Sequence, residues 1–324
     1  MDKESIYTST GIKYHRAYQV FESLRHGIGR PQSLQVSLTN RCNLSCVFCS
    51  VAERKLKQEW NLINLYCAIK AFTRIGIKTI EFSGGGEPLL YPNFDDIIMF
   101  SKARGFSIGL ITNGLLLKNH DSILQLFDWI RISMVALDYQ DEVELPESFP
   151  SYVTLGMSYI VGQKVYGNDH RRYKEIDVLN KIKEYAKRYN VSYVRIVPEC
   201  MSDEDEMNQL HASYGTMIKD EFGHPFFFQP KKQKQAAACW MDAVKPWLNT
   251  DGYIYPCNSI PLNTDANRNF APQYRLCHWT EIEKYYRNRG KESLDVSKCD
   301  RCTFCRNNEI IKGLIQPMEH EAFL

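Results

Sequence analysis

The chain has 324 residues, of which 44% are hydrophobic and 24% are charged, so it has enough apolar residues for a folded core and does not have the composition of a disordered protein. Its 40 Lys and Arg residues nearly balance its 38 Asp and Glu residues, which gives no general attraction for nucleic acid or for an anionic membrane. No apolar run approaches the roughly 20 residues of a membrane span, and the N-terminus lacks the apolar segment of a secretory signal, so we expect a cytoplasmic enzyme.

Strands and helices are predicted to alternate from residue 33 onward, after a helical lead-in at residues 15–24. The strand candidates are short β-rich runs at residues 33–38, 79–83, 107–112, 129–135, 152–160 and 192–197. The helix candidates carry apolar residues at three- and four-residue spacing and lie at residues 61–75, 93–104, 121–127 and 177–189. Because only a crossover returns the chain to the same end of a sheet, this order predicts an α/β fold with a parallel sheet. The sheet is expected to be a partial (β/α)6 barrel or an open doubly wound sheet, with functional residues at the C-terminal ends of its strands.

The pattern changes after about residue 225. Residues 224–239 combine an aromatic, a basic and an alanine run, which indicates a linker or docking segment. Asp251 and Gly252 then mark the turn of a hairpin, with Tyr253–Tyr255 as its returning strand, and residues 280–290 are predicted to form one helix. We therefore predict a helical lead-in at residues 1–30, an α/β core at 31–225 and a small second domain at 226–324.

The 11 cysteines are clustered rather than scattered. Three lie near the start of the core, two stand apart as Cys67 and Cys200, and six lie near the C-terminus: Cys239, Cys257, Cys277, Cys299, Cys302 and Cys305. In a reducing cytoplasm, thiols separated by two or three residues are typical of metal ligands rather than of disulfides. The odd total also argues against a fully paired disulfide framework.

The first cluster, Cys42, Cys46 and Cys49, lies in the loop after the first predicted strand. Three thiolates bind only three irons of a four-iron cluster, which leaves the fourth iron open to a small molecule. An open metal position is typical of catalytic rather than structural sites. Zinc is the alternative, but zinc prefers four ligands, and no fourth Cys or His lies close by in the sequence.

This C-x3-C-x-aromatic-C pattern, with Phe48 at the aromatic position, resembles the signature of the radical S-adenosylmethionine (SAM) superfamily. The resemblance implies a [4Fe-4S] cluster held by Cys42, Cys46 and Cys49, whose open iron binds the amine and carboxylate of SAM. One-electron reduction of the sulfonium then gives methionine and a 5′-deoxyadenosyl radical, which abstracts a substrate hydrogen. It also implies a flavodoxin- or ferredoxin-type electron donor.

Later motifs extend the resemblance over residues 33 to 200. The glycine-rich turn after the second strand contains Gly84, Gly85 and Gly86 and resembles the family's GGEP element. The resemblance implies that the backbone of this turn meets the SAM ammonium and that Glu87 balances the positive charge of that ammonium. By the same resemblance, Asn113 in ITNG and Ser133 in RIS are implied SAM contacts, and residues 154–162 form the adenine-contacting strand. Outside the family, these residues are read as ordinary turn residues and a sheet hydroxyl.

The second cluster resembles the SPASM and twitch domains, which carry auxiliary clusters behind many radical SAM cores. Gly252 stands four residues before Cys257 in the C-x-n-G-x4-C element that begins at Cys239, whereas the longer SPASM block is absent. The resemblance therefore implies one auxiliary [4Fe-4S] cluster. Cys239, Cys257 and Cys302 are its expected ligands, the fourth being Cys299 or Cys305, with Cys277 as a further candidate. A zinc ribbon that staples a small domain is the alternative.

The sequence indicates the type of reaction less clearly than it indicates the cofactors. An auxiliary cluster that accepts an electron from a substrate radical favours a dehydrogenase, as in twitch-type aminocyclitol dehydrogenases, acting on a small sugar-, cyclitol- or nucleoside-like substrate. An epimerase needs a thiol donor instead, and Cys200 follows the sixth strand, although a structural thiol is the competing interpretation. Glu199 and Arg195 are candidates for deprotonating or binding the substrate, with surface ion pairing as the alternative.

Three further interpretations stay open. A peptide-modifying enzyme of the kind that matures ribosomal peptides is one; only 41 residues precede Cys42, so we expect its leader peptide to need a separate partner. The other two are a two-cluster electron carrier and a zinc-stapled scaffold. Neither of these explains the GGEP, ITNG and RIS motifs at successive strand ends.

Overall fold

The computed structural model describes residues 6–8, 11–163, 172–263 and 272–316. The chain divides into two compact units that are interleaved along the sequence: residues 1–36, 60–79 and 233–324 form the first, and residues 37–59 and 80–232 form the second. These units follow the packing of the chain, whereas the boundaries expected at residues 30 and 225 follow its composition. Those boundaries remain a prediction.

The sheet of the second unit is built from strands that follow one another in chain order. They are β2 (Thr79–Phe82, whose first residue belongs to the first unit), β3 (Ser107–Thr112), β4 (Trp129–Ser133), β5 (Thr154–Val161), β6 (Tyr193–Pro198) and β7 (Phe226–Phe228). Every pair from β3 to β7 is parallel. The predicted α/β class with a parallel sheet is confirmed.

The linker interpretation is wrong at its start, because Phe226–Phe228 forms β7 and pairs with β6. The ring of Phe226 is buried and lies 5.1 Å from that of Phe222, while the ring of Phe227 lies 6.2 Å from that of Tyr193. These aromatic side chains pack against other rings and belong to the sheet, whereas the side chains of a solvated linker are exposed to water.

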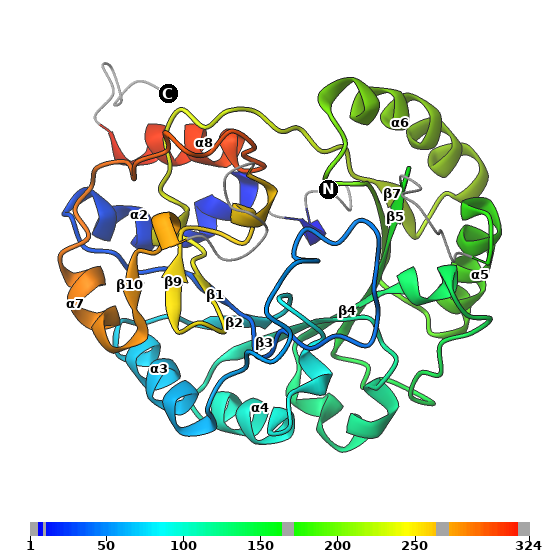
Figure 1. Cartoon of the computed structure of the whole chain (residues 1–324), viewed down its shortest axis with the longest axis horizontal. Helices are drawn as coiled ribbons and strands as arrows, with labels where there is room; N and C mark the ends of the chain where they lie inside the picture. The colour runs from blue at the N-terminus through cyan, green and yellow to red at the C-terminus, as the bar shows by residue number, and fades with distance from the viewer. Residues whose placement is uncertain (1–5, 9–10, 164–171, 264–271, 317–324) are drawn as a thin grey trace. The chain divides into compact units, whose positions relative to one another are not determined.

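The helices of the second unit cover one side of this sheet, as Figure 1 shows for α4, α5 and α6. They are α4 (Phe94–Lys102), α5 (Glu175–Arg188) and α6 (Glu204–Met217), with short helices η2 (Pro88–Leu90), η3 (Leu117–Leu126), η4 (Met134–Asp138) and η5 (Ile218–Phe222). The helix expected at residues 121–127 is the 3-10 helix η3, kinked at His120. Helix α6 begins with a capping box between Asp203 and Glu206, which satisfies backbone N–H groups at its start.

Alternation along the strands gives the sheet two different faces. On β4, Ile130 and Ile132 are fully buried, whereas Trp129, Arg131 and Ser133 are only partly buried. Successive strand residues point to opposite faces, so the apolar face packs under helices and the other face carries polar groups.

The first unit contains a smaller mixed sheet: β1 (Ser33–Val36) pairs in parallel with β8 (Trp247–Leu248), which pairs antiparallel with β9 (Tyr253–Tyr255), and β9 pairs antiparallel with β10 (Cys277–His278). The predicted hairpin is confirmed, and Gly252 takes a φ of 83° at its turn. The helices are η1 (Gly11–Ala17), α2 (Tyr18–Arg25), α3 (Leu62–Arg74), η6 (Met241–Ala243), η7 (Ile260–Leu262), η9 (Pro272–Tyr274), η10 (Trp279–Glu281), α7 (Ile282–Arg287) and α8 (Cys305–Ile315). The single helix expected at residues 280–290 is therefore η10 followed by α7.

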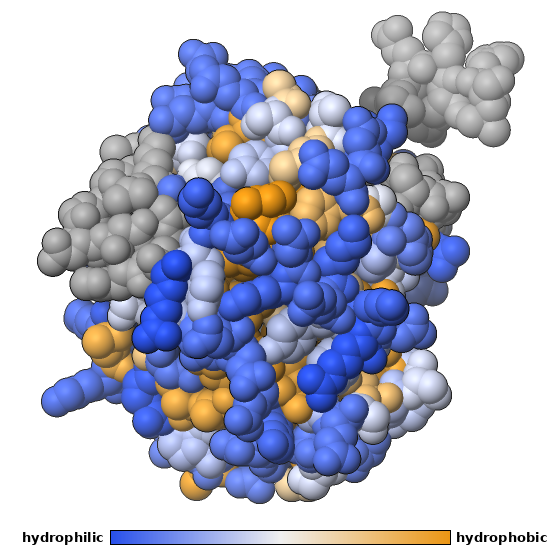
Figure 2. Space-filling model, turned by 90° about the vertical axis from the view of Figure 1, so that its right-hand side faces the viewer, coloured by the Kyte–Doolittle hydropathy of each residue, from blue (hydrophilic) through white to orange (hydrophobic). Residues whose placement is uncertain are grey.

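The face of the molecule in Figure 2 is mostly hydrophilic, with apolar residues in small groups. The large apolar side chains that are exposed come from separate places in the sequence, such as Tyr18, Ile63 and Tyr152. In the part of the chain that the structure describes, no helix combines the length and the apolar character needed to cross a membrane.

Candidate functional site

Cys42, Cys46 and Cys49 lie in an irregular loop of the second unit and are all partly buried. The Cys49 N–H donates to the Cys46 carbonyl at 3.1 Å, which turns the chain between these two residues. Burial raises the pKa of the Cys46 thiol to about 12, and the charges of Cys49 and Cys42 act in the same direction. The neighbouring thiols therefore add to the cost of ionising Cys46 when no metal is bound.

The spacing of these thiols is relevant to the kind of metal. Among the described residues, no three His, Cys, Asp or Glu side chains are gathered in a way that holds a single metal ion. Ligands of one zinc ion all lie about 2.0–2.3 Å from it, whereas each thiolate of a four-iron cluster binds a different iron. The chemistry of the donor set, three thiols on one loop with no fourth Cys or His close by in the sequence, fits a four-iron cluster with one open iron.

Arg54 places a positive charge beside the loop. Its Nη1 donates to Cys49 Sγ at 3.6 Å and its Nε donates to the Asn40 carbonyl at 2.7 Å, while the residue is 9% exposed. A nearly buried guanidinium next to a sulfur offsets the negative charge that a bound cluster would bring. Sequence reasoning missed Arg54, although a basic residue five positions after the last cysteine was a visible signal.

The glycine-rich turn after β2 packs directly against the backbone of the cysteine loop. The Glu87 N–H donates to the Arg41 carbonyl at 2.7 Å, and a Cβ added to Gly86 would lie only 1.9 Å from that same oxygen. Ser37 Oγ donates to the Gly84 carbonyl. Glycine is therefore required here for close approach of two backbones, which an ordinary strand-to-loop turn does not demand.

The carboxylate of Glu87 ties this turn to the end of β3. It accepts from Thr112 Oγ1 at 2.6 Å, from the Asn113 N–H at 2.8 Å and from the Leu89 N–H at 3.2 Å, and Glu87 is 3% exposed. This side chain therefore joins the turn to the end of β3, and the role of its charge toward SAM stays a prediction.

Asn113 continues the connection back to the cysteine loop. Its Nδ2 donates to Asn43 Oδ1 at 2.7 Å, and its Oδ1 accepts from the Leu115 N–H at 3.1 Å. The turn, the end of β3 and the cysteine loop are thus joined through Glu87, Asn113 and Asn43. The sequence analysis missed Asn43, which lies directly after the first ligand candidate.

The other predicted SAM contacts are Ser133, Phe48 and Gly85, which lie at a strand end, in the cysteine loop and in the glycine-rich turn. Ser133 is the last residue of β4, partly buried, and in register with Ser158 of β5, so two hydroxyl groups lie on neighbouring strands. Phe48 is partly buried within the cysteine loop, and Gly85 takes a φ of 102° in the turn. These positions agree with a ligand-facing edge of the sheet, and their roles stay predictions.

A buried acid that the sequence analysis missed lies after β4. Asp138 is fully buried and accepts from Tyr159 Oη at 2.5 Å and from Gln163 Nε2 at 3.0 Å. Its charge also raises the pKa of Cys46, after the larger effects of burial and of the other two thiols. The available signal was an acid at the end of an apolar run, which indicates a partnered buried group.

Cys200, Glu199 and Arg195 lie on and after β6, as predicted. Burial raises the pKa of the Cys200 thiol to about 11, the Glu199 carboxylate acts in the same direction, and Cys49 contributes a smaller effect of the same sign. Cys200 is therefore close enough to the cysteine loop to respond to its charge. Glu199 is 1% exposed, and Arg195 is in register with Ser158.

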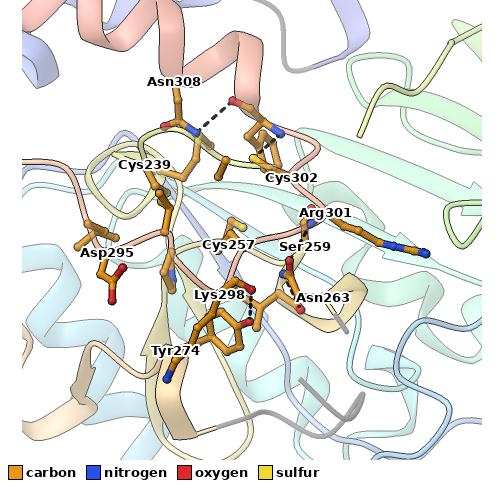
Figure 3. Close-up of a pocket in the computed structure, with 18 of the residues that line it drawn as sticks. Cys239, Cys257, Ser259, Asn263, Tyr274, Asp295, Lys298, Arg301, Cys302 and Asn308 are labelled. Atoms are coloured by element: carbon orange, nitrogen blue, oxygen red, sulfur yellow. Dashed lines mark hydrogen bonds between the residues drawn. The ribbon is translucent and has the colours of Figure 1, made fainter. Parts of the chain in front are cut away.

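The second cysteine cluster lines a cavity of about 270 Å³ in the first unit (Figure 3). Four of its lining residues are cysteines: Cys239, Cys257, Cys299 and Cys302. Neither Cys277 nor Cys305 is among the lining residues. Cys305 is the first residue of α8, with its Sγ 3.7 Å from the carbonyl oxygen of Lys234.

Hydrogen bonds from backbone N–H groups fix three of the four cysteine segments around this cavity, those of Cys239, Cys299 and Cys302. The Ala236 N–H donates to the Cys299 carbonyl at 2.9 Å, and the Leu294 N–H donates to the Cys239 carbonyl at 2.9 Å. The Phe304 N–H lies 3.3 Å from Cys302 Sγ, to which it donates. N–H donors aimed at sulfur stabilise thiolates and are one of the means by which proteins tune an iron–sulfur cluster.

Comparison with known proteins identifies a shared domain. The family model described as the radical SAM superfamily matches residues 36–144. A probable GTP 3′,8-cyclase of Methanopyrus kandleri is 34% identical over 121 residues, which are 36% of this chain and 38% of that protein. The GTP 3′,8-cyclase of Staphylococcus saprophyticus is 35% identical over 132 residues, with the same two coverages. The chain thus matches less than two fifths of the length of these relatives.

Solved structures share the fold over more of the chain. The structure of anSMEcpe with bound AdoMet and the Cp18Cys peptide matches 91% of this chain and 86% of its own, with a TM-score of 0.53 and 13% identity. Streptococcus suis SuiB bound to S-adenosylmethionine matches 87% of this chain and 75% of its own, with a TM-score of 0.52 and 13% identity. At this identity the likeness concerns the fold.

The buried Glu87 carboxyl predicts a pH dependence of stability. Burial raises its pKa from the ordinary 4.5 to about 7, against the opposing effect of its three hydrogen bonds. The folded chain therefore holds this proton more tightly than the unfolded chain. The protonated Glu87 carboxyl therefore contributes about 3 kcal/mol to the free energy of unfolding. This contribution is complete below pH 4.5 and is lost as the pH rises through about 7.

Denaturant unfolding of the cluster-free protein at several pH values measures this effect. The unfolding free energy of the wild type relative to Glu87→Gln should fall across that window. The matched control is Glu144→Gln, whose carboxylate is 73% exposed and which should parallel the wild type. Equal pH slopes for wild type and Glu87→Gln would contradict the prediction.

Proposed function

We propose that the chain is a radical SAM enzyme that binds a [4Fe-4S] cluster at Cys42, Cys46 and Cys49 and cleaves SAM reductively. The match of the radical SAM family model to residues 36–144 supports this proposal. When bound, the reduced cluster supplies the electron that splits the sulfonium and generates the 5′-deoxyadenosyl radical. The observation that carries the proposal is the loop with three thiols within eight residues, fixed to the turn after β2 and to the end of β3 through Glu87, Asn113 and Asn43.

The surrounding residues have separate roles in this proposal. Arg54 offsets the negative charge on the Cys49 side of the loop, to which it donates a hydrogen bond. Ser133 and Ser158 offer hydroxyl groups to SAM from neighbouring strand ends. The backbone of Gly84, Gly85 and Gly86 stands next to the cysteine loop, where it would meet the SAM ammonium.

We further propose that Cys239, Cys257, Cys299 and Cys302 hold one auxiliary [4Fe-4S] cluster. Their common place in the wall of one cavity supports this ligand set over one that includes Cys305. Burial raises the pKa of the Cys257 thiol to about 12, so in the free protein this thiol is protonated, and metal binding has to release its proton. The N–H groups of Ser259 and Ile260 act in the opposite direction and favour the thiolate.

The proposed reaction is a dehydrogenation of a small polar substrate. With four cysteine ligands the auxiliary cluster has no open iron, which suits an electron acceptor better than a substrate-binding site. Such an acceptor removes the electron left on a substrate radical, so the net reaction is a two-electron oxidation. The reductant for SAM cleavage is then a flavodoxin- or ferredoxin-type protein.

Two other radical SAM reactions are retained as second candidates. Peptide modification is supported by the fold likeness to SuiB and anSMEcpe, which were crystallised with a precursor peptide and with the Cp18Cys peptide, respectively. Epimerisation is supported by Cys200, a thiol that follows β6 and responds to the charge of Cys49. An epimerase gives a hydrogen atom back to the substrate radical from such a thiol.

Removing the first cysteine set should abolish SAM cleavage without removing the auxiliary cluster. After anaerobic reconstitution, the wild type should contain about eight irons, and the triple variant Cys42→Ala, Cys46→Ala, Cys49→Ala about four. Formation of 5′-deoxyadenosine with dithionite should fall to background in the variant. Tightly bound zinc and no SAM cleavage by the wild type would instead support a zinc-stapled scaffold, and eight irons without cleavage would support an electron carrier.

The ligand assignment of the auxiliary cluster predicts a difference between two neighbouring cysteines. Cys299→Ala leaves the auxiliary cluster with three cysteine ligands, as at Cys42, Cys46 and Cys49, and should change the visible absorption and the electron paramagnetic resonance signal of that cluster. Cys305→Ala, which lies outside the wall, should leave the iron content and the visible absorption unchanged. The reverse pattern would move the fourth ligand to Cys305.

Solvent isotope incorporation separates the dehydrogenase from the epimerase. A dehydrogenase consumes one SAM for each two-electron oxidation and places no solvent deuterium at the reacting carbon. An epimerase in D₂O places deuterium there through the exchangeable thiol of Cys200, and Cys200→Ala then stops product formation while SAM cleavage continues. We expect no deuterium in the product, and Cys200-dependent incorporation would replace the dehydrogenase with the epimerase.

A further inference from the structure

Two arginines stand on one face of the parallel sheet, in the second unit. Arg131 of β4 is in register with Gly156 of β5, which is in register with Tyr193 of β6. Residues in register point to the same face of a sheet, and so do residues two apart on one strand. Arg195, two residues after Tyr193, therefore shares this face with Arg131. It is the face opposite the fully buried side chain of Ile132.

A rigid aromatic arrangement fixes the position of Arg131. A Cβ added to Gly156 would lie 2.1 Å from Cζ of Tyr193, so the Tyr193 ring lies across the bare backbone of β5 and reaches toward β4. There Trp129 Nε1 donates to Tyr193 Oη at 2.9 Å. The Arg131 guanidinium lies over the Trp129 ring, 5.1 Å from its centroid, which is a cation–π distance.

The charges of both arginines converge on the hydroxyl of Tyr193. Burial raises the pKa of Tyr193, and the positive charges of Arg131 and Arg195 act in the opposite direction, as does a hydrogen bond that involves Arg131. Arg131 and Arg195 therefore both place positive charge on the face of the sheet that carries Tyr193, and an anion on this face is attracted to both.

Arg131 has no counter-ion among the residues that the structure describes. None of the ion pairs between described residues includes Arg131, and its Nε is buried without a hydrogen-bond partner. Placing a guanidinium donor away from water without an acceptor is costly. A planar guanidinium with unused donors is well suited to a carboxylate or phosphate group.

We propose that Arg131 and Arg195, with Tyr193 between them, bind an anionic group of the substrate, either a carboxylate or a phosphate. Arg131 is two residues before Ser133, about 7 Å along the strand at the usual rise per residue. Arg195 is in register with Ser158, one of the two hydroxyl groups proposed for SAM, so the anion site borders the SAM site and lies deeper in the sheet on the Arg131 side. This inference rests on the proposed function for what happens to the substrate, and it narrows the substrate class to acids.

Anion binding tests the site directly on the reconstituted full chain. Inorganic phosphate and acetate are titrated by calorimetry in the presence of SAM. The wild type should bind at least one of them, and Arg131→Gln and Arg195→Gln should each weaken that binding about tenfold or more. Arg131→Lys keeps the charge without the planar fork and should weaken it less. The matched control is Arg188→Gln, an exposed arginine of α5 that should bind the anion as the wild type does.

Several outcomes would overturn the proposal. One is a wild type that binds neither phosphate nor acetate, and another is a folded Arg131→Gln variant, verified by circular dichroism, that binds the anion as the wild type does. A third is a loss of SAM affinity in Arg131→Gln as large as the loss of anion affinity, because the arginine then serves SAM. Cleavage of SAM by the wild type is measured separately. If the wild type binds the anion but does not cleave SAM, the anion site is supported and the proposed function is contradicted. If it cleaves SAM but does not bind the anion, the proposed function is supported and the anion site is contradicted.

Discussion

The site of the second unit depends on one constraint, the close approach of the glycine-rich turn to the backbone of the cysteine loop. Gly86 packs so tightly against the Arg41 carbonyl that no side chain fits between them, and the Glu87 N–H donates to the same oxygen. The Glu87 carboxylate then fixes this contact to the end of β3. A flexible loop with three thiols thereby acquires a fixed place beside the sheet, which a cofactor site needs because a displaced ligand loses affinity and reactivity.

Buried charge is used differently in the two units. In the second unit, Arg54 lies beside a thiol, Asp138 is held by a tyrosine and a glutamine, and Arg131 has no acid opposite it among the described residues. In the first unit, Arg289 and Asp242 form a fully enclosed ion pair at 2.5 Å, with 3% and 0% of their side chains exposed. A satisfied pair serves the fold, whereas an unsatisfied buried group indicates a binding site.

Much of the fold was predictable because it follows from local patterns. The β3 strand was predicted to the residue, other strands to within about two residues, and the Asp251–Gly252 hairpin from its turn chemistry. The linker interpretation was wrong at its start, because Phe226–Phe228 pairs with β6 and Phe227 contacts Tyr193, and these partners are far away in the sequence. For the same reason the sequence pointed to Cys42 and Glu87 by their motifs, but not to Asn43, Arg54 or Asp138, whose roles come from contacts across the fold.

The central claim is that Cys42, Cys46 and Cys49 leave one iron of a cluster open to SAM. Electron paramagnetic resonance of the reduced first cluster tests it most directly, in a variant with Cys239, Cys257, Cys299 and Cys302 all changed to Ala, so that the auxiliary cluster does not contribute. Addition of SAM should change the spectrum, because a new ligand at the open iron alters the electronic structure of the cluster. A spectrum that SAM leaves unchanged, from a cluster that is fully assembled, would contradict the account.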